Sequence, residues 1–228
     1  MRRFFAEAGR WALAILAVLV VRATVAAPFE IPSGSMLPTL QIGDRILASK
    51  FAYGWSRFSP PVTLPGPNGR LSFSDPKRGD VVVFVHPRQG NVWVKRVIGL
   101  PGDEVALLHG RLRINNVEVQ RERVGVSQLE THGVRMPVTE YRETLPGAAS
   151  SHAIWLVKDD APLENWGPVR VPPGKLLMLG DNRDDSADSR VSLDDGGVGL
   201  LPIENVLGRA DVILFSTAAS PRFLHKVE

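Results

Sequence analysis

Three segments of this chain carry side chains that could do chemistry. The first, FEIPSGSMLPTL over residues 29–40, places Ser35 next to a glycine in a turn bracketed by Pro32 and Pro38. Such a turn could present a reactive hydroxyl, and the alternative is an ordinary loop. A serine becomes a strong nucleophile only when a base takes its proton. The five histidines fit no triad signature and no metal-ligand spacing, so we expect no metal site; they occupy positions 86, 109, 132, 152 and 225.

Lysine is the other available base. The chain has 27 Lys and Arg residues, of which six are lysine. The alternation of VWVKRVIG, residues 92–99, puts Trp93, Lys95 and Val97 on one face of a predicted strand. Burial beside these apolar neighbours would lower the pKa of the Lys95 amine and let it act as a general base; the alternative is a solvated lysine at a strand edge. A Ser–Lys dyad is therefore physically available.

The third segment is GDNRDDSADSR, residues 180–190. Its alternating acidic residues suggest a calcium loop, but Arg183 occupies the third position of the EF-hand pattern and the sixth holds no glycine. Asp188 and Arg190 could pair as a structural clamp, and the Ser186 hydroxyl could orient a lysine amine. The spacing is equally compatible with a solvated loop.

These segments need a scaffold, which the composition predicts to be one mostly β domain. The chain has 228 residues, 44% hydrophobic and 22% charged, enough for one sizeable core. No cysteine is present, which excludes a disulfide scaffold and a thiol nucleophile. Residues 54–76 and 105–170 are predicted excursions from the core. Short apolar runs separated by Gly and Pro predict strands over residues 45–51, 80–85, 92–99, 104–108, 111–114, 117–122, 154–158, 170–171, 175–179 and 206–215.

An apolar run, WALAILAVLVV over residues 11–21, lies between Arg10 and Arg22. It has the length and basic flank of a cleavable signal peptide, with small residues at Val25 and Ala27. It also fits a transmembrane helix over residues 11–27, whose roughly 17 positions are near the lower limit for a bilayer. In both cases the preceding arginines predict a cytoplasmic N-terminus.

Taken together, the segments resemble bacterial type I signal peptidases, the leader peptidases of the Ser–Lys class. The matching motifs are FEIPSGSMLPTLQIGDRIL, KRGDVVVF, VWVKRVIGLPGD and GDNRDDSADSR. The resemblance implies an antiparallel-sheet catalytic domain with a smaller inserted β-rich subdomain, preceded by one transmembrane helix. It implies a membrane-anchored serine endopeptidase that needs no cofactor and removes signal peptides from exported preproteins after small residues at −1 and −3.

The resemblance also assigns roles by position. Ser35 is expected to be the nucleophile and Lys95 the general base, and Ser33 to supply an oxyanion-hole hydroxyl beside the Ser35 backbone N–H. Four residues are expected to orient or support the lysine, namely Ser186, Gly180, Asp188 and Arg190. The substrate pockets are expected to be lined by Phe29, Ile31, Pro32, Leu40 and Val94.

The same resemblance favours a retained anchor over a cleaved signal, because only about eight residues separate Ala27 from Ser35. The expected partners are signal peptides and lipids of the cytoplasmic membrane, with no nucleic acid, and the protein is expected to be a monomer. One departure is Asp185, where the family often has asparagine. The expected division is a cytoplasmic N-terminus over 1–10, the anchor over 11–27 and an extracytoplasmic catalytic domain over 28–228.

Three alternatives remain at this stage. A self-cleaving repressor also uses a Ser–Lys dyad, but it carries a DNA-binding helix-turn-helix where this chain has an apolar span. A non-enzymatic β domain anchored in the membrane could bind exported chains without cutting them. A specialised relative could process a single conjugation or pilus substrate.

Overall fold

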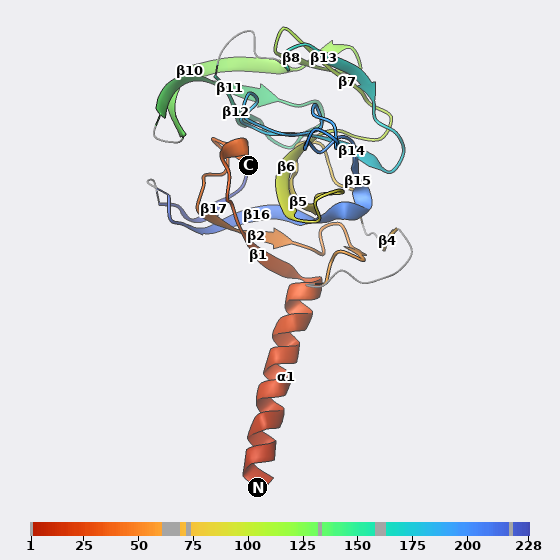
Figure 1. Cartoon of the computed structure of the whole chain (residues 1–228), viewed down its shortest axis with the longest axis vertical. Helices are drawn as coiled ribbons and strands as arrows, with labels where there is room; N and C mark the ends of the chain where they lie inside the picture. Colours follow the sequence, from red (N-terminus) through yellow and green to blue (C-terminus); the bar gives the residue numbers. More distant parts are fainter. Residues whose placement is uncertain (1, 61–68, 72–73, 132–133, 158–162, 219–220) are drawn as a thin grey trace.

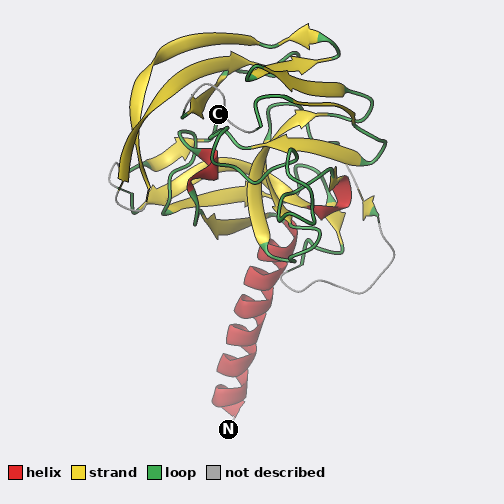
Figure 2. Cartoon of the chain, turned by 45° about the horizontal axis from the view of Figure 1, so that its top comes forward, coloured by secondary structure: helices red, strands yellow, loops and turns green. Residues whose placement is uncertain are grey.

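The computed structural model describes residues 2–60, 69–71, 74–131, 134–157, 163–218 and 221–228. Both predicted excursions are therefore described in part, and residues 61–68, 72–73, 132–133 and 158–162 lie outside the described chain, as does Met1 of the predicted cytoplasmic segment. Strands dominate, and the named strands pair antiparallel (Figure 2). The predicted mostly β, antiparallel fold is confirmed.

The elements follow in chain order. One α-helix, α1 (Arg2–Thr24), precedes the strands, and two 3-10 turns, η1 (Gly34–Met36) and η2 (Ile203–Asn205), interrupt them. The strands are β1 (Ala26–Glu30), β2 (Asp44–Ser49), β3 (Trp55–Ser56), β4 (Arg70–Leu71), β5 (Val81–Val85), β6 (Val92–Gly99), β7 (Glu104–Leu108), β8 (Arg111–Ile114), β9 (Val117–Glu118), β10 (Gln120–Thr131), β11 (Val134–Thr144), β12 (His152–Leu156), β13 (Trp166–Arg170), β14 (Lys175–Leu179), β15 (Leu201–Pro202), β16 (Val206–Ser216) and β17 (Phe223–Lys226).

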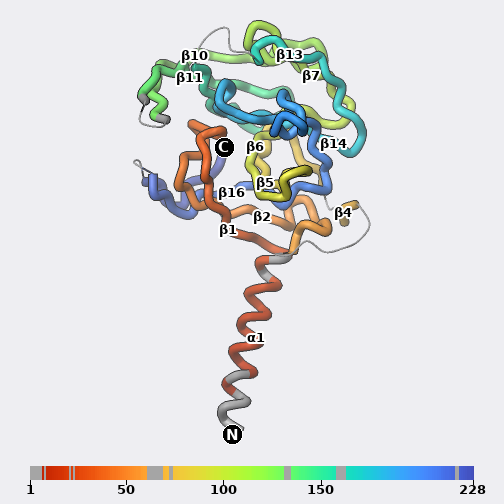
Figure 3. Tube along the Cα trace, viewed as in Figure 1, coloured from red at the N-terminus to blue at the C-terminus, as the bar shows by residue number. Residues whose placement is uncertain are grey.

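The largest sheet has the order β1-β2-β16-β5-β6-β14-β15, with β17 paired to β16. It brings the N-terminal strands next to a C-terminal one, as the colours of β2 and β16 show in Figure 3. Strand β5 reads as a continuous apolar run because both of its faces are covered. Val81 and Val83 pack in one hydrophobic cluster, whereas Val82 and Phe84 pack in another. Its neighbour β6 is thereby held between two buried layers.

The predicted excursion over residues 105–170 forms two further sheets. One has the order β13-β7-β8-β9 and the other the order β10-β11-β12. Side chains of the first sheet, such as Val105 and Leu112, share a cluster with Ile98 of β6 and Leu177 of β14. This part of the excursion therefore packs on the main sheet through a common core.

Helix α1 projects from the body, with the N-terminus at its far end (Figure 1). The helix ends at Thr24, and Ala26 and Ala27 already belong to β1, where Ala27 pairs with Ala48. The helix therefore ends three residues before residue 27, where the predicted span ends, because the chain turns into the main sheet there. Among the described residues, no helix has both the length and the apolar character needed to cross a membrane.

Candidate active site

Ser35 lies in the 3-10 turn η1, within a segment, residues 33–36, that we call the serine turn. Met36 is 1% exposed and anchors the turn in the core, while Ser35 is half-buried. The Leu37 amide donates a hydrogen bond to the Gly34 carbonyl and closes the turn at 3.0 Å. The turn thus holds the Ser35 hydroxyl at a fixed place beside the main sheet.

Lys95 reaches this hydroxyl from β6. Its Nζ donates a hydrogen bond to Ser35 Oγ at 2.6 Å and lies 5.4 Å from the centre of the Trp93 ring. The residue is only 3% exposed. This burial lowers the pKa of Lys95 to about 8, although the charges of Asp188 and Asp181 oppose the shift. A substantial fraction of the amine is therefore neutral near neutral pH.

The third segment, residues 180–190, lies against the serine turn, and we call it the acidic loop. The Asn182 backbone N–H donates to the Ser35 carbonyl at 3.2 Å, and its side-chain Nδ2 donates to the Gly34 carbonyl at 3.1 Å. A Cβ at Gly180 would collide with the Ser186 side chain and lie 2.5 Å from the Ser35 carbonyl oxygen. Only glycine fits at this contact.

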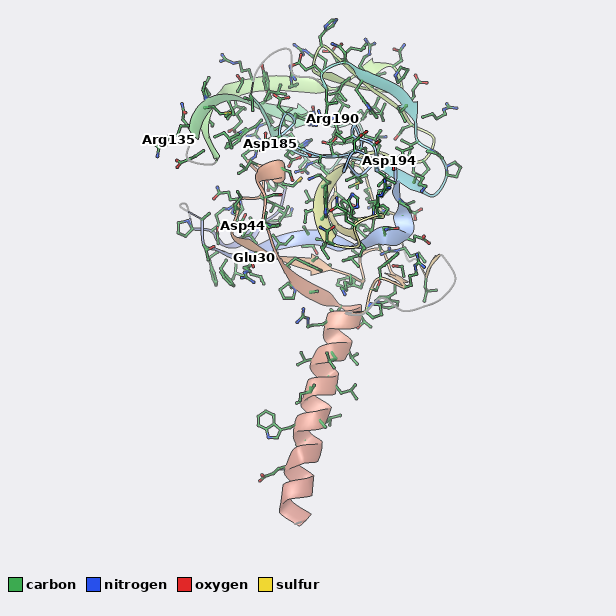
Figure 4. All side chains as sticks on the ribbon, in the orientation of Figure 1. Glu30, Asp44, Arg135, Asp185, Arg190 and Asp194 are labelled. Atoms are coloured by element: carbon green, nitrogen blue, oxygen red, sulfur yellow. The ribbon has the colours of Figure 1, made fainter. Side chains whose placement is uncertain are left out.

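Asp188 and Arg190 form the ion pair expected of them. Arg190 donates from Nε to Asp188 Oδ1 at 2.9 Å and from Nη2 to Oδ2 at 2.8 Å. The same carboxylate accepts the Gly180 amide at 3.0 Å. Arg190, which Figure 4 labels, is buried in this arrangement. The pair therefore fixes the start of the acidic loop.

Two predicted hydroxyls have weaker contacts. Ser33 Oγ is 3.4 Å from Ser35 Oγ and exposed, so it is free to turn toward a bound group. Ser186 Oγ is buried and makes no hydrogen bond within the described part of the chain. The hydrogen bond expected between Ser186 and the Lys95 amine is thus not formed here.

A cleft of about 440 Å³ opens in front of Ser35 and Lys95. Four of the predicted pocket residues line it, namely Phe29, Ile31, Pro32 and Val94. The fifth, Leu40, is fully buried in the core cluster that contains Met36 and is absent from the lining. The sequence interpretation assigned no pocket role to several further lining residues, which include Glu30, Asn91, Val92, Trp93, Asp185 and Ala187.

A buried ion pair lies on the opposite side of β6 from Lys95. Arg96 donates to both carboxylate oxygens of Asp181, at 2.8 and 2.7 Å, and Thr39 donates to the same carboxylate at 2.5 Å. Arg96 and Asp181 are 2% and 1% exposed. Because Thr39 follows the serine turn and Asp181 lies at the start of the acidic loop, this pair joins the serine turn, β6 and the acidic loop.

Comparison with known protein families gives the class of this protein. A model of the family described as "Signal peptidase, peptidase S26" matches residues 5–215. The chain belongs to this signal peptidase family, and its enzymatic class is that of a serine peptidase.

Curated relatives agree with the family assignment. Signal peptidase I of Rickettsia typhi is 36% identical over 219 residues, covering 92% of this chain and 80% of the relative. Signal peptidase I of Rickettsia akari is 37% identical over 214 residues, covering 90% of this chain and 77% of the relative. A crystal structure of a signal peptidase I from Enterococcus faecalis is 27% identical, covers 60% of this chain and 98% of its own, and has a TM-score of 0.34. Membership of this family supports signal peptide removal as the activity.

Proposed function

We propose that the protein removes N-terminal signal peptides from exported preproteins, with Ser35 as nucleophile and Lys95 as general base. The observation that carries this proposal is the 2.6 Å contact between Lys95 Nζ and Ser35 Oγ at a lysine that is only 3% exposed. A buried amine is the kind of base that can activate a serine without histidine.

In the acylation step, neutral Lys95 accepts the proton of Ser35 as Oγ attacks the carbonyl carbon before the scissile bond. The Ser35 backbone N–H and the Ser33 hydroxyl hold the negative charge that develops on the carbonyl oxygen. Each such donor contributes about 2.7–4 kcal/mol in comparable sites. Lys95 then passes its proton to the leaving amine, and the signal peptide remains bound to Ser35 as an ester.

In the second step, Lys95 takes a proton from a water that attacks this ester and gives it to Ser35 Oγ as the ester bond breaks, so the signal peptide leaves with a free carboxyl group and the serine is restored. The base works twice because it loses its proton to the leaving amine after acylation. Its burial keeps bulk water from holding it in the ammonium form.

The cleft supports a preference for small side chains at −1 and −3. Ile31 and Val94 present apolar surface beside the two reacting residues, and the volume of about 440 Å³ is shared by the whole bound segment. Phe29 and Pro32 extend the apolar wall along the cleft. We propose that an extended chain with alanine at −1 and −3 lies along this wall.

We also propose that the protein acts at the cytoplasmic membrane with its body on the outer side. Support comes from α1, whose described apolar side chains are exposed, including Trp11, Leu13 and Ile15 at 72%, 68% and 58%. Single-pass topology with a cytoplasmic N-terminus stays a prediction. It is tested by reporter fusions at each end of the full chain together with extraction of membranes in alkaline carbonate; release of the protein by carbonate would contradict an integral anchor.

The proposed chemistry is tested by cleavage of a peptide with alanine at −1 and −3. Ser35→Ala and Lys95→Ala should each lower kcat by at least about 10²–10⁴-fold while circular dichroism shows an intact fold. Lys77→Ala, which changes an exposed lysine, is the matched control and should cleave like the unaltered chain.

The same assay separates the proposal from a non-enzymatic binding domain. A binding domain would retain the peptide uncut, and Lys95→Ala would leave its behaviour in cells unchanged. Full cleavage by either dyad variant would contradict the assignment of Ser35 and Lys95.

A further inference from the structure

A buried ion pair connects the 105–170 excursion to the acidic loop. Arg183 donates from Nη1 to Glu143 Oε1 at 2.9 Å and from Nη2 to the second oxygen of the same carboxylate. Their side chains are each 2% exposed. Burial alone would raise the pKa of Glu143, but the charge of Arg183 and the hydrogen bonds that Arg183 donates outweigh it and hold that pKa below its ordinary value. Both groups are therefore charged and paired.

Strand β12 contacts the same loop through its backbone. The Trp155 amide donates to the Asp181 carbonyl at 2.9 Å, and the Arg183 amide donates to the Trp155 carbonyl at 3.0 Å. These two bonds form a parallel bridge between Trp155 and Asn182. The excursion thus holds three consecutive residues of the acidic loop by one ion pair and two backbone bonds.

The same stretch of the acidic loop, residues 181–183, also contacts the serine turn. Asn182 donates to the carbonyls of Gly34 and Ser35 at 3.1 and 3.2 Å. Arg183 Nε donates to the Gly180 carbonyl at 3.2 Å, next to the place where only glycine fits. A path of direct contacts therefore runs from Glu143 through Arg183 and Asn182 to Ser35.

We propose that Glu143 and Arg183 are positioning residues for Ser35, so that the excursion sets the rate of the acylation step. The inference rests on the proposed function of Ser35. Neither residue lines the cleft, so neither is expected to contact the substrate. A misplacement of a reacting atom by about 1 Å can slow a reaction about 10²-fold, which is why a remote clamp can govern the rate.

The guanidinium of Arg183 suits this task because its donors lie in one plane. Two of them meet the Glu143 carboxylate and a third meets the Gly180 carbonyl, so the orientation of the loop is fixed relative to β11. A lysine would keep the positive charge but would lose this planar arrangement of donors. The Arg183→Lys substitution therefore separates charge from geometry.

The test compares Glu143→Gln and Arg183→Lys with the unaltered chain in steady-state and single-turnover cleavage of the alanine peptide. The matched control is Glu130→Gln, which breaks the exposed pair of Glu130 with Arg135 on the same hairpin. Figure 4 shows Arg135 at the outer end of the hairpin, away from Arg190. The midpoint of thermal unfolding is measured for each variant, and the assay is run well below the lowest of these midpoints.

We expect both variants to lower kcat and the acylation rate about tenfold to 10²-fold, with KM unchanged within about twofold because the cleft is intact. Glu130→Gln should match the unaltered chain. Asn182→Ala, which removes a donor without leaving a buried charge, should show the same loss of kcat. Combining it with Arg183→Lys should lose less than the product of the two single losses, because both act through one loop.

A purely structural role would give a different result. Lower unfolding midpoints with unchanged kcat would overturn the inference, as would multiplicative losses in the double variant. If Glu143→Gln yields no folded protein, Arg183→Lys and Asn182→Ala decide. Failure of the proposed function is seen separately, since then the unaltered chain does not cleave the peptide or Ser35→Ala still does.

Discussion

Lys95 Nζ donates a 2.6 Å hydrogen bond to Ser35 Oγ, although the two residues are 60 positions apart in the sequence. The main sheet creates this contact, because β6 carries the lysine at its centre while β1 leads directly into the serine turn. Burial lowers the pKa of Lys95 to about 8, so about a tenth of the amine is neutral at pH 7. An unperturbed lysine would be neutral in less than about one molecule in a thousand.

The pH dependence of cleavage follows from this pKa. Protonated Lys95 cannot accept the serine proton, so kcat/KM, which reports the free enzyme, should fall about tenfold for each pH unit below about 8 and level off above it. The measurement is kcat/KM from pH 5.5 to 9.5, with circular dichroism at each pH as a control for folding. A flat profile between pH 6 and 7 would exclude Lys95 as the base.

Gly180→Ala should inactivate the enzyme with less effect on folding than on rate. The added Cβ would collide with Ser186 and approach the Ser35 carbonyl to 2.5 Å, which pushes the serine turn away from Lys95. We expect kcat to fall by about 10²-fold or more. Gly125→Ala is the matched control, because a Cβ there meets nothing within 4 Å. Equal activities of the two variants would show that the contact does not position Ser35.

Several strands could be predicted from the sequence with their ends. Apolar alternation bounded by turn residues predicts residues 92–99, 104–108, 111–114 and 175–179, and these are the bounds of β6, β7, β8 and β14. The long hairpin of β10 and β11 could not be predicted in the same way, because the strand predicted over residues 117–122 covers β9 and only the start of β10. Its strands are rich in charged residues, because much of the hairpin faces solvent and the hydrophobic pattern is weak.

In the candidate site, too, some features could be predicted from the sequence and others could not. Ser35, Lys95 and the acidic loop could be selected from the sequence because the roles proposed for them, a nucleophile, a base and a supporting loop, need particular side chains. The contacts of Asn182 could not be predicted, because its partners are the backbone carbonyls of Gly34 and Ser35, and any residue supplies such a carbonyl. The role of Glu143 could not be predicted either, because its partner lies 40 positions away in the acidic loop. Leu40 shows the opposite error, as its apolar side chain serves the core and not the cleft.

Ser33→Ala should slow the reaction without weakening substrate binding. The Ser33 hydroxyl is 3.4 Å from Ser35 Oγ and exposed, so it can turn toward the oxyanion in the transition state. Loss of one such donor should lower kcat about 10²–10³-fold with KM nearly constant. Ser33→Thr keeps a hydroxyl and should recover most of the rate, whereas Ser150→Ala changes an exposed serine elsewhere and should have no effect. A threonine variant as slow as the alanine variant would argue against a role for the hydroxyl.

The buried pair of Arg96 and Asp181 should make stability depend on acid pH. Burial alone would raise the pKa of Asp181, but the charge and hydrogen bonds of Arg96 and the bond from Thr39 hold it below its ordinary value. As the pH falls, the Asp181 carboxylate of the unfolded chain is therefore protonated near pH 4, whereas in the folded chain it stays ionised to lower pH. The contribution of this carboxylate to stability is complete above about pH 5 and is lost as the pH falls through the unfolded and then the folded pKa.

Asp181→Asn should lower the free energy of unfolding by about 3–5 kcal/mol at pH 7, since it leaves Arg96 charged and buried. It should also make the free energy of unfolding, measured with urea, fall less steeply as the solution is made more acidic. Asp194→Asn changes an 85% exposed carboxylate and should leave this pH dependence unchanged. The same dependence on acid pH in Asp181→Asn and in the unaltered chain would mean that other carboxylates govern acid unfolding.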